Sequence, residues 1–174
     1  MKIGVIGMGF VGGTTAKILE KVHKIYAYDK FKEPYNTDKN LELLAKNSES
    51  IFICVPTPAQ RTGAIDYSAI HNSLAQLLGA TYECRRKPQE LLVIIRSTAT
   101  SGSTDELAKN YKFKFAFNPE FLREKHALED MKNTNRIIIG AEEPDIAEKI
   151  ISIYKPLFPN AVYRFRNRKT AEMD

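Results

Sequence analysis

Three glycines near the N-terminus constrain the fold of this chain more than any other feature of its sequence. Gly7, Gly9 and Gly12 follow a short apolar run, and apolar residues at helical spacing follow them at once. This is the strand-to-helix context in which a GxGxxG motif binds a dinucleotide. Gly7 allows a tight turn, Gly9 lets the backbone approach a ligand, and Gly12 lets the helix pack close to the strand. The helix start, at Phe10 and Val11, offers free N–H groups to a pyrophosphate.

A second strand pattern ends in an acidic residue, Asp29. It lies at about the 20-residue offset from the glycines at which a carboxylate binds the hydroxyl groups of the adenine ribose. An acid at this place favours NAD, because it would repel the 2′-phosphate of NADP. Lys30 weakens that preference and is itself a candidate contact for the cofactor. The strand, glycines, helix, second strand and acid together predict NAD binding, and an ordinary glycine turn is the alternative.

The composition is that of a globular protein with one domain. The chain has 174 residues, of which 43% are hydrophobic and 27% charged, enough to build a real core. Its net charge of +5 is mild, although part of it gathers in the basic run at 164–169. Such a run can indicate nucleic acid, but a solvated end or a surface for anionic ligands is the simpler interpretation, and no aromatic-rich RNA motif accompanies it. We therefore expect no nucleic-acid partner.

Targeting signals and metal motifs are not evident in the sequence. No run approaches the ~18 apolar residues of a membrane span, and a strand pattern follows Met1 directly, so we expect neither membrane attachment nor a signal peptide. Cys54 and Cys84 lack metal-ligand spacing, which predicts no metal site and a reducing, cytoplasmic location. Cys54 falls inside an apolar strand pattern, as an inert thiol would. The basic residues 85–87 could lower the pKa of the Cys84 thiol.

Strand and helix patterns alternate along the rest of the chain. We expect strands at 25–29, 51–55, 91–95, 113–117, 136–140 and 161–163, helices at 41–45, 66–78, 105–110 and 144–154, and a helix or helical turn at 120–131. This order predicts an α/β fold that is Rossmann-like: a doubly wound, mainly parallel sheet with helices on both faces. Its ligand cleft should lie beyond the carboxyl ends of the strands.

Four loops should meet at that edge of the sheet. The candidate residues of the three loops beyond the glycines are Val55, Pro56, Thr57 and Pro58, then Ser97 and Thr98, and then Glu120 and Glu124. Glu120 and Glu124 are four residues apart, so on a helix they would share a face and could orient water or take protons. A solvated helix face is the alternative for the two glutamates, and a simple strand-end cap is the alternative for Ser97 and Thr98.

Together these loops resemble the NAD-binding domain of the UDP-glucose/GDP-mannose dehydrogenase family, the nucleotide-sugar 6-dehydrogenases. The resemblance covers nearly the whole chain. It rests on the residues at 7–12, 53–58 and 96–98 and, most specifically, on Asn118-Pro119-Glu120-Phe121-Leu122-Arg123-Glu124. It implies oxidation of a sugar C6 alcohol to a carboxylate in two NAD-dependent steps, through a thiohemiacetal and a thioester on a cysteine.

The resemblance also implies roles for particular residues. Thr98 and Glu120 would help to position the reacting water and the C6 centre, and Glu124 would lie near the nicotinamide. Thr57 and Pro58 would line the cofactor cleft. Compared with the family, the connection between Asp29 and Ile51 is short.

Part of the family's machinery would lie beyond Asp174. This includes the rest of a dimerising helix, the domain that grips the nucleotide sugar, and the catalytic lysine, asparagine and cysteine. Residues 1–168 would form the NAD-binding domain, and 169–174 the start of the linking helix. We therefore expect a nucleotide-sugar substrate such as UDP-glucose to be bound only when a substrate domain is supplied. A partner chain or a homo-oligomer is possible, and the chain alone should not complete the reaction.

Two further functions remain as alternatives. A non-catalytic NAD-binding or protein-interaction module could use the apolar surface left by the missing helix, but it would have no need of carboxylates at the nicotinamide end. A different GxGxxG dehydrogenase, acting on a small hydroxy acid, is the second alternative, but it does not explain the sequence motif at 118–124.

Overall fold

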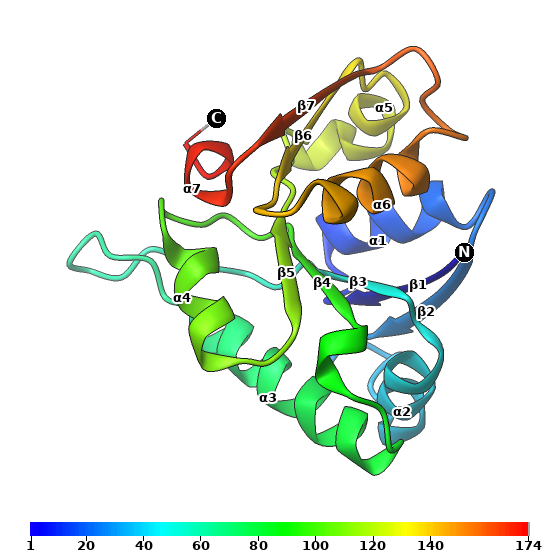
Figure 1. Cartoon of the computed structure of the whole chain (residues 1–174), viewed down its shortest axis with the longest axis vertical. Helices are drawn as coiled ribbons and strands as arrows, with labels where there is room; N and C mark the ends of the chain where they lie inside the picture. Colours follow the sequence, from blue (N-terminus) through cyan, green and yellow to red (C-terminus); the bar gives the residue numbers. More distant parts are fainter. Residues whose placement is uncertain (174) are drawn as a thin grey trace.

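A sheet organises the chain in the computed structural model, which describes residues 1–173. Within this range the sheet has seven strands in the order β2-β1-β3-β4-β5-β6-β7 (Figure 1). The strands are β1 Lys2–Ile6, β2 Lys24–Tyr28, β3 Ser50–Ile53, β4 Leu92–Ile95, β5 Lys114–Phe117, β6 Arg136–Gly140 and β7 Val162–Arg166. Strands β1 to β5 are mutually parallel, β6 joins β5 in the antiparallel sense, and β7 runs parallel to β6.

Helices cover both faces of this sheet. They are α1 Phe10–Leu19, α2 Asp38–Asn47, α3 Ser68–Glu83, α4 Ser103–Asn110, α5 Ala127–Lys132, α6 Pro144–Tyr154 and α7 Arg168–Ala171, with 3-10 turns η1 Pro88–Glu90 and η2 Glu124–His126. Figure 1 shows α1, α5 and α6 on one side and α2, α3 and α4 on the other. The predicted doubly wound, mainly parallel fold is confirmed.

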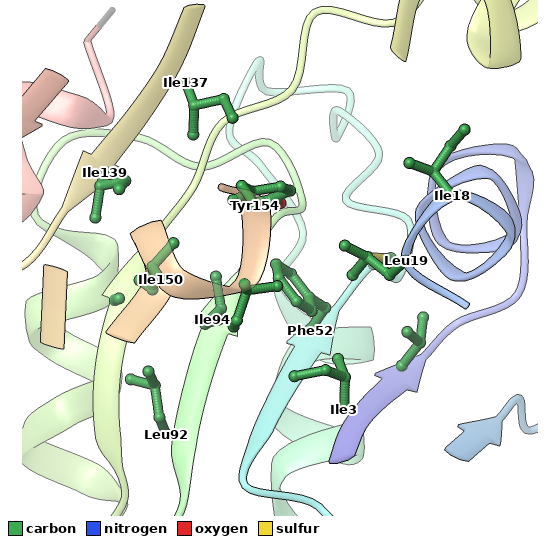
Figure 2. Packing of buried hydrophobic residues seen from close by; sticks show 14 of the residues in the cluster. Ile3, Ile18, Leu19, Phe52, Leu92, Ile94, Ile137, Ile139, Ile150 and Tyr154 are labelled. Atoms are coloured by element: carbon green, nitrogen blue, oxygen red, sulfur yellow. The ribbon is translucent and has the colours of Figure 1, made fainter. Parts of the chain in front are cut away.

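Side-chain alternation divides the core into two clusters. Along β3, Phe52 faces α1 and α6, whereas its neighbours Ile51 and Ile53 face α2 and α3. Strands buried on both faces need apolar residues at every position, and this is why β3 and β4 read as continuous apolar runs. Figure 2 shows the first cluster, in which Phe52 lies close to Ile94, Leu19 and Tyr154. The rings of Phe52 and Tyr154 meet edge to face, with centroids 6.1 Å apart.

The strand order locates the ligand cleft. The chain leaves β1 for β2 on one side and then crosses to β3 on the other, so the loops after β1 and β3 run in opposite directions. A crevice opens where such loops diverge, outside the carboxyl ends of the strands. The glycine loop follows β1 and residues 54–58 follow β3, so both lie at this crevice.

The helix or helical turn predicted at 120–131 is wrong over residues 120–123. Residues 118–123 are irregular, a 3-10 turn occupies Glu124–His126, and α5 begins only at Ala127. Side chains hold this segment in its non-helical course: the Glu120 carboxylate accepts from the Leu122 amide at 2.6 Å, and Asp130 accepts from the Arg123 amide at 2.8 Å. Such local side-chain bonds compete with helix formation.

The C-terminal segment docks against α4. Glu172 accepts hydrogen bonds from the amides of Gly102 and Thr104, at 2.5 and 2.8 Å, and so caps the start of α4. Arg168 pairs with Asp105 at 2.6 Å. The domain boundary predicted at residue 168 stays a prediction, and residue 174 of the predicted linking segment lies outside the described residues. In the described part of the chain, none of the helices is long and apolar enough to span a bilayer.

Candidate functional site

A cleft with two halves lies at the crevice between the loops after β1 and β3. The half beside Asp29 has a volume of about 450 Å³ and the half beside Thr98 about 410 Å³. We call them the Asp29 half and the Thr98 half. They share Gly9, Cys54, Val55 and Pro56, so they adjoin at the glycine loop and form one groove with two compartments. A ligand with two lobes joined by a linker fits this arrangement.

The glycine loop has the geometry that the motif predicts. Gly7 has φ of +90°, a conformation that disfavours other residues. A Cβ on Gly12 would lie 1.8 Å from the Gly7 carbonyl oxygen, so α1 packs directly on the turn. A Cβ on Gly9 would meet no atom within 4 Å. The backbone at Gly9 is therefore bare on the side of the cleft, and the free N–H groups of the first turn of α1 lie beside it. A pyrophosphate fits this cradle.

Asp29 organises the glycine loop in addition to lining the cleft. One carboxylate oxygen accepts from the Met8 amide at 2.6 Å, and the other accepts from the Phe31 and Lys32 amides at 2.9 and 3.0 Å. Lys32 Nζ donates back to the Met8 carbonyl at 2.8 Å. These bonds fix the end of β2 against the glycine loop, a role for Asp29 that the sequence alone did not predict.

The Asp29 half contains residues that sequence reasoning missed. Phe31 lines it with a side chain that is 84% exposed, and Lys30 Nζ lies 5.4 Å from the centre of the Phe31 ring. The sequence feature that could have identified Phe31 as a cleft residue is its aromatic side chain within the polar stretch after Asp29. The opposite wall comes from α3, distant in sequence, through Ser68, Ala69, Asn72, Ser73 and Gln76. This half of the cleft is therefore walled by Phe31 and α3 in a chain whose connection between Asp29 and Ile51 is short.

The Thr98 half brings together the segments that follow β1, β3, β4 and β5. Its lining includes Phe10, Val11, Thr57, Pro58, Ser97, Thr98 and Glu120. Thr57 Oγ1 donates to the Thr98 carbonyl at 2.9 Å, and Ser97 Oγ donates to the Val55 carbonyl at 2.6 Å. The hydroxyls of Thr57 and Ser97 thus tie two loops together. Of the predicted site residues, Gly12 and Glu124 line neither half: Gly12 lies behind the turn, and Glu124 is exposed in η2.

The predicted pairing of Glu120 and Glu124 on one helix face is wrong. Glu120 lies in the irregular segment before η2 and lines the Thr98 half, where its carboxylate is fixed by the Leu122 amide. An ion pair of 2.7 Å between Arg123 and Asp130 anchors the segment further. The hydrogen bond from the Arg123 side chain lowers the pKa of Asp130 to about 2. The loop therefore presents one carboxylate to the cleft.

A buried cation, Arg96, lies at the floor of the Thr98 half. Arg96 is 7% exposed, and Nη1 donates to Asn118 Oδ1 at 2.5 Å and to the Tyr154 hydroxyl at 3.2 Å. Tyr154 also donates to Asn118 Oδ1 at 2.7 Å, and Asn118 Nδ2 donates to the Ile138 carbonyl at 2.7 Å. Within residues 1–173 no carboxylate lies within ion-pair distance of this guanidinium. The sequence indicated Arg96 only as part of a motif.

The two cysteines differ in position. Burial raises the pKa of the Cys54 thiol to about 12, so this thiol stays protonated and unreactive where it lines the cleft. The apolar strand pattern around Cys54 predicted an inert thiol. The expectation that basic residues 85–87 lower the pKa of Cys84 is wrong. Partial burial and the nearby Glu42 raise it, and Sγ lies 3.7 Å from the Glu42 carbonyl oxygen. Residues 1–173 hold no cluster of three or more His, Cys, Asp or Glu side chains that could bind a metal ion.

We expect Cys54 to resist alkylation in the folded protein. At pH 8, iodoacetamide should modify Cys84 first and Cys54 only as the chain unfolds, which peptide mass spectrometry can measure. The folded state favours the neutral Cys54 thiol, and this preference contributes to the free energy of unfolding. The contribution is complete below the ordinary thiol pKa of 9.0 and is lost as pH rises towards about 12. Cys84→Ser is the control and should leave the native protein unmodified. Rapid labelling of Cys54 in that variant would contradict burial.

Comparison with known proteins gives one consistent result. The NAD binding domain of the UDP-glucose/GDP-mannose dehydrogenase family matches residues 27–158. A UDP-glucose 6-dehydrogenase from Rickettsia bellii is 33% identical over 121 residues, which are 66% of this chain and 26% of that protein. The chain spans between 26% and 43% of the length of the curated relatives it matches.

Solved structures agree in fold. The structure of a GDP-mannose dehydrogenase from Pseudomonas aeruginosa superposes with a TM-score of 0.81 at 23% identity, covering 99% of this chain and 48% of that one. A UDP-glucose dehydrogenase from Pyrobaculum islandicum gives a TM-score of 0.80 at 25% identity, covering 99% of this chain and 47% of that one.

Proposed function

The chain belongs to the UDP-glucose/GDP-mannose dehydrogenase family as its NAD-binding domain, and we propose that it supplies the cofactor half of a nucleotide-sugar 6-dehydrogenase. The observation that supports this most is the two-part cleft with a bare backbone at Gly9 between its halves. The rest of such an enzyme, which binds the nucleotide sugar, is supplied by further sequence, a partner chain or an oligomer. We place this activity in the cytoplasm, in keeping with two free cysteines.

Each part of the cleft takes one part of the dinucleotide in this proposal. The Asp29 half holds the adenosine, with the Asp29 carboxylate on the ribose hydroxyls, Lys30 beside it, and Phe31 as a stacking surface. The pyrophosphate lies on Gly9 and the start of α1, at Phe10 and Val11. The nicotinamide enters the Thr98 half, against the wall that the joined loops provide through Val55, Pro56, Thr57, Pro58, Ser97 and Thr98.

The chemistry requires that a hydride and a proton leave the C6 alcohol separately. When bound, NAD⁺ accepts the hydride. Thr98 and Glu120 line the half where the sugar C6 would lie, and we assign them to orient the hydroxyl or water and to take up the proton. Glu124 lines neither half, so its assignment to the nicotinamide rests on the family resemblance. Because the chain spans a minor part of its relatives, we expect no steady oxidation of UDP-glucose at or above roughly 1 per second by the chain alone.

We expect saturable binding of one NAD⁺ per chain and much weaker binding of NADP⁺. Calorimetric titration of each nucleotide measures both constants. Asp29→Ala should weaken NAD⁺ binding by roughly 10- to 100-fold, because it removes a charged hydrogen-bond acceptor of the ribose and also the acceptor of the Met8 amide.

Asp29→Asn separates these two effects. It keeps an oxygen that can accept from the Met8 amide, but it loses the acceptor of the Phe31 and Lys32 amides and the charge that repels a 2′-phosphate. The preference for NAD⁺ over NADP⁺ should therefore shrink while the glycine loop keeps its bond to residue 29. Equal binding of both nucleotides by the unchanged chain, or no binding of either, would overturn the proposed function.

A further inference from the structure

A second cavity lies directly behind the Thr98 half of the cleft. Its volume is about 70 Å³, and Arg96, Asn118, Glu120, Thr134 and Arg136 supply the polar part of its wall. By the same measure one water molecule needs roughly 15 Å³ and two to four polar partners. The cavity is therefore large enough and polar enough for several water molecules.

Glu120 stands in the wall between this cavity and the cleft. It lines both spaces, as does Arg96. Its carboxylate is fixed by the Leu122 amide at 2.6 Å, and Leu122 belongs to the wall of the cavity. On the other side lies Cys54 in the cleft, whose raised pKa is due first to burial and in part to the negative charge of Glu120. The carboxylate is thus within reach of both compartments.

The outer end of the cavity reaches the surface away from the cleft. Phe121 and Arg136 line the cavity, are exposed, and do not line the cleft. The Arg136 guanidinium lies 5.3 Å from the centre of the Phe121 ring. Solvent can therefore enter the cavity by a route that a ligand in the cleft would not block.

We propose that this cavity holds a chain of water molecules through which Glu120 returns protons to solvent behind the occupied cleft. The inference rests on the proposed function, in which oxidation of an alcohol to an aldehyde by a nicotinamide dinucleotide releases one proton for each hydride. The O–H bond breaks, the proton passes to the Glu120 carboxylate and then to water, and the C6–H bond yields the hydride. With dinucleotide and sugar filling the cleft, the proton needs this second exit. The positive charges of Arg96 and Arg136 oppose its retention inside.

A crystal structure of the chain with NAD⁺ bound tests the proposal directly. It should show ordered water inside the cavity, with at least one molecule about 3 Å from a Glu120 carboxylate oxygen. A dry cavity, or water out of reach of Glu120, would overturn the proposal.

Solution NMR on the same complex provides a second test that uses variants of the outer wall. A resident water should give a nuclear Overhauser effect to the Leu122 amide proton. Thr134→Leu should fill the cavity and abolish that signal, whereas Thr134→Ser, which keeps the hydroxyl and adds no bulk, should retain it. A signal that persists unchanged in Thr134→Leu would mean that the water comes from the cleft, and the rear passage would be wrong.

The outcome is separable from that of the proposed function. If NAD⁺ fails to bind, the dehydrogenase assignment falls regardless of the water. If NAD⁺ binds and the cavity is dry, only the proton exit falls.

Discussion

Gly12→Ala is expected to abolish NAD⁺ binding and to lower the free energy of unfolding by about 3 kcal/mol, at the upper end of what overpacking costs. The added Cβ would lie 1.8 Å from the Gly7 carbonyl oxygen and 3.1 Å from Cys54 Cβ. Backbone cannot yield there without moving α1 away from β1, which also dismantles the pyrophosphate cradle. Urea unfolding followed by circular dichroism measures the first effect, and calorimetric titration with NAD⁺ measures the second.

Two neighbouring glycines are matched controls for this prediction. A Cβ on Gly13 would meet only the Met8 carbonyl oxygen, at 3.7 Å, so Gly13→Ala should stabilise α1 by about 0.5–1 kcal/mol. A Cβ on Gly9 would meet nothing within 4 Å, so Gly9→Ala should fold normally yet bind NAD⁺ poorly, because the methyl group enters the cleft. If Gly12→Ala behaved like Gly13→Ala, the close approach of helix and turn would be wrong.

Asn118→Ala is expected to lower the free energy of unfolding by about 3–5 kcal/mol, because it removes three hydrogen bonds of buried groups at roughly 1–2 kcal/mol each. Asn118 is 1% exposed and accepts hydrogen bonds from both Arg96 and Tyr154 while donating to the Ile138 carbonyl. Its loss removes three hydrogen bonds of buried groups and leaves the Arg96 guanidinium, which has no carboxylate nearby in residues 1–173, with only its 3.2 Å bond to the Tyr154 hydroxyl. Denaturant unfolding of the variant measures the effect.

Tyr154→Phe is the control, because it removes one hydroxyl from the same network and leaves Asn118 bound to Arg96. It should cost about 1 kcal/mol. If the two variants lost equal free energy of unfolding, Arg96 would have to be solvated, and Asn118 would not be the group that stabilises its charge.

Local residue patterns were sufficient to predict most of the fold and to identify the family. Continuous apolar runs identified β3 and β4, because a strand covered on both faces needs apolar residues at each position. The family resemblance inferred from the glycine loop and the string at 118–124 is confirmed by the match over residues 27–158. The placement of Glu120 at the cleft followed from the rule that loops after parallel strands meet at one edge.

Other features depend on partners that no local pattern reveals. The helix expected at 120–131 begins late because Glu120 and Asp130 bind nearby amides. The antiparallel join of β6 to β5 leaves no trace in the periodicity of either strand. The pKa of Cys84 rises because the fold brings it beside α2, where partial burial and Glu42 outweigh its basic sequence neighbours.

The sequence by itself determined the α/β class, the glycine turn and the acid after β2. Each of these depends on residues close together along the chain, such as glycines at a tight turn and an acid at a set offset from them. Only the tertiary structure decided what surrounds them. The wall from α3, the bond from Asp29 to Met8, the buried Arg96 with Asn118 and Tyr154, and the cavity behind Glu120 join segments far apart in sequence. Their meeting is fixed by how helices pack on the sheet, which residue spacing does not encode.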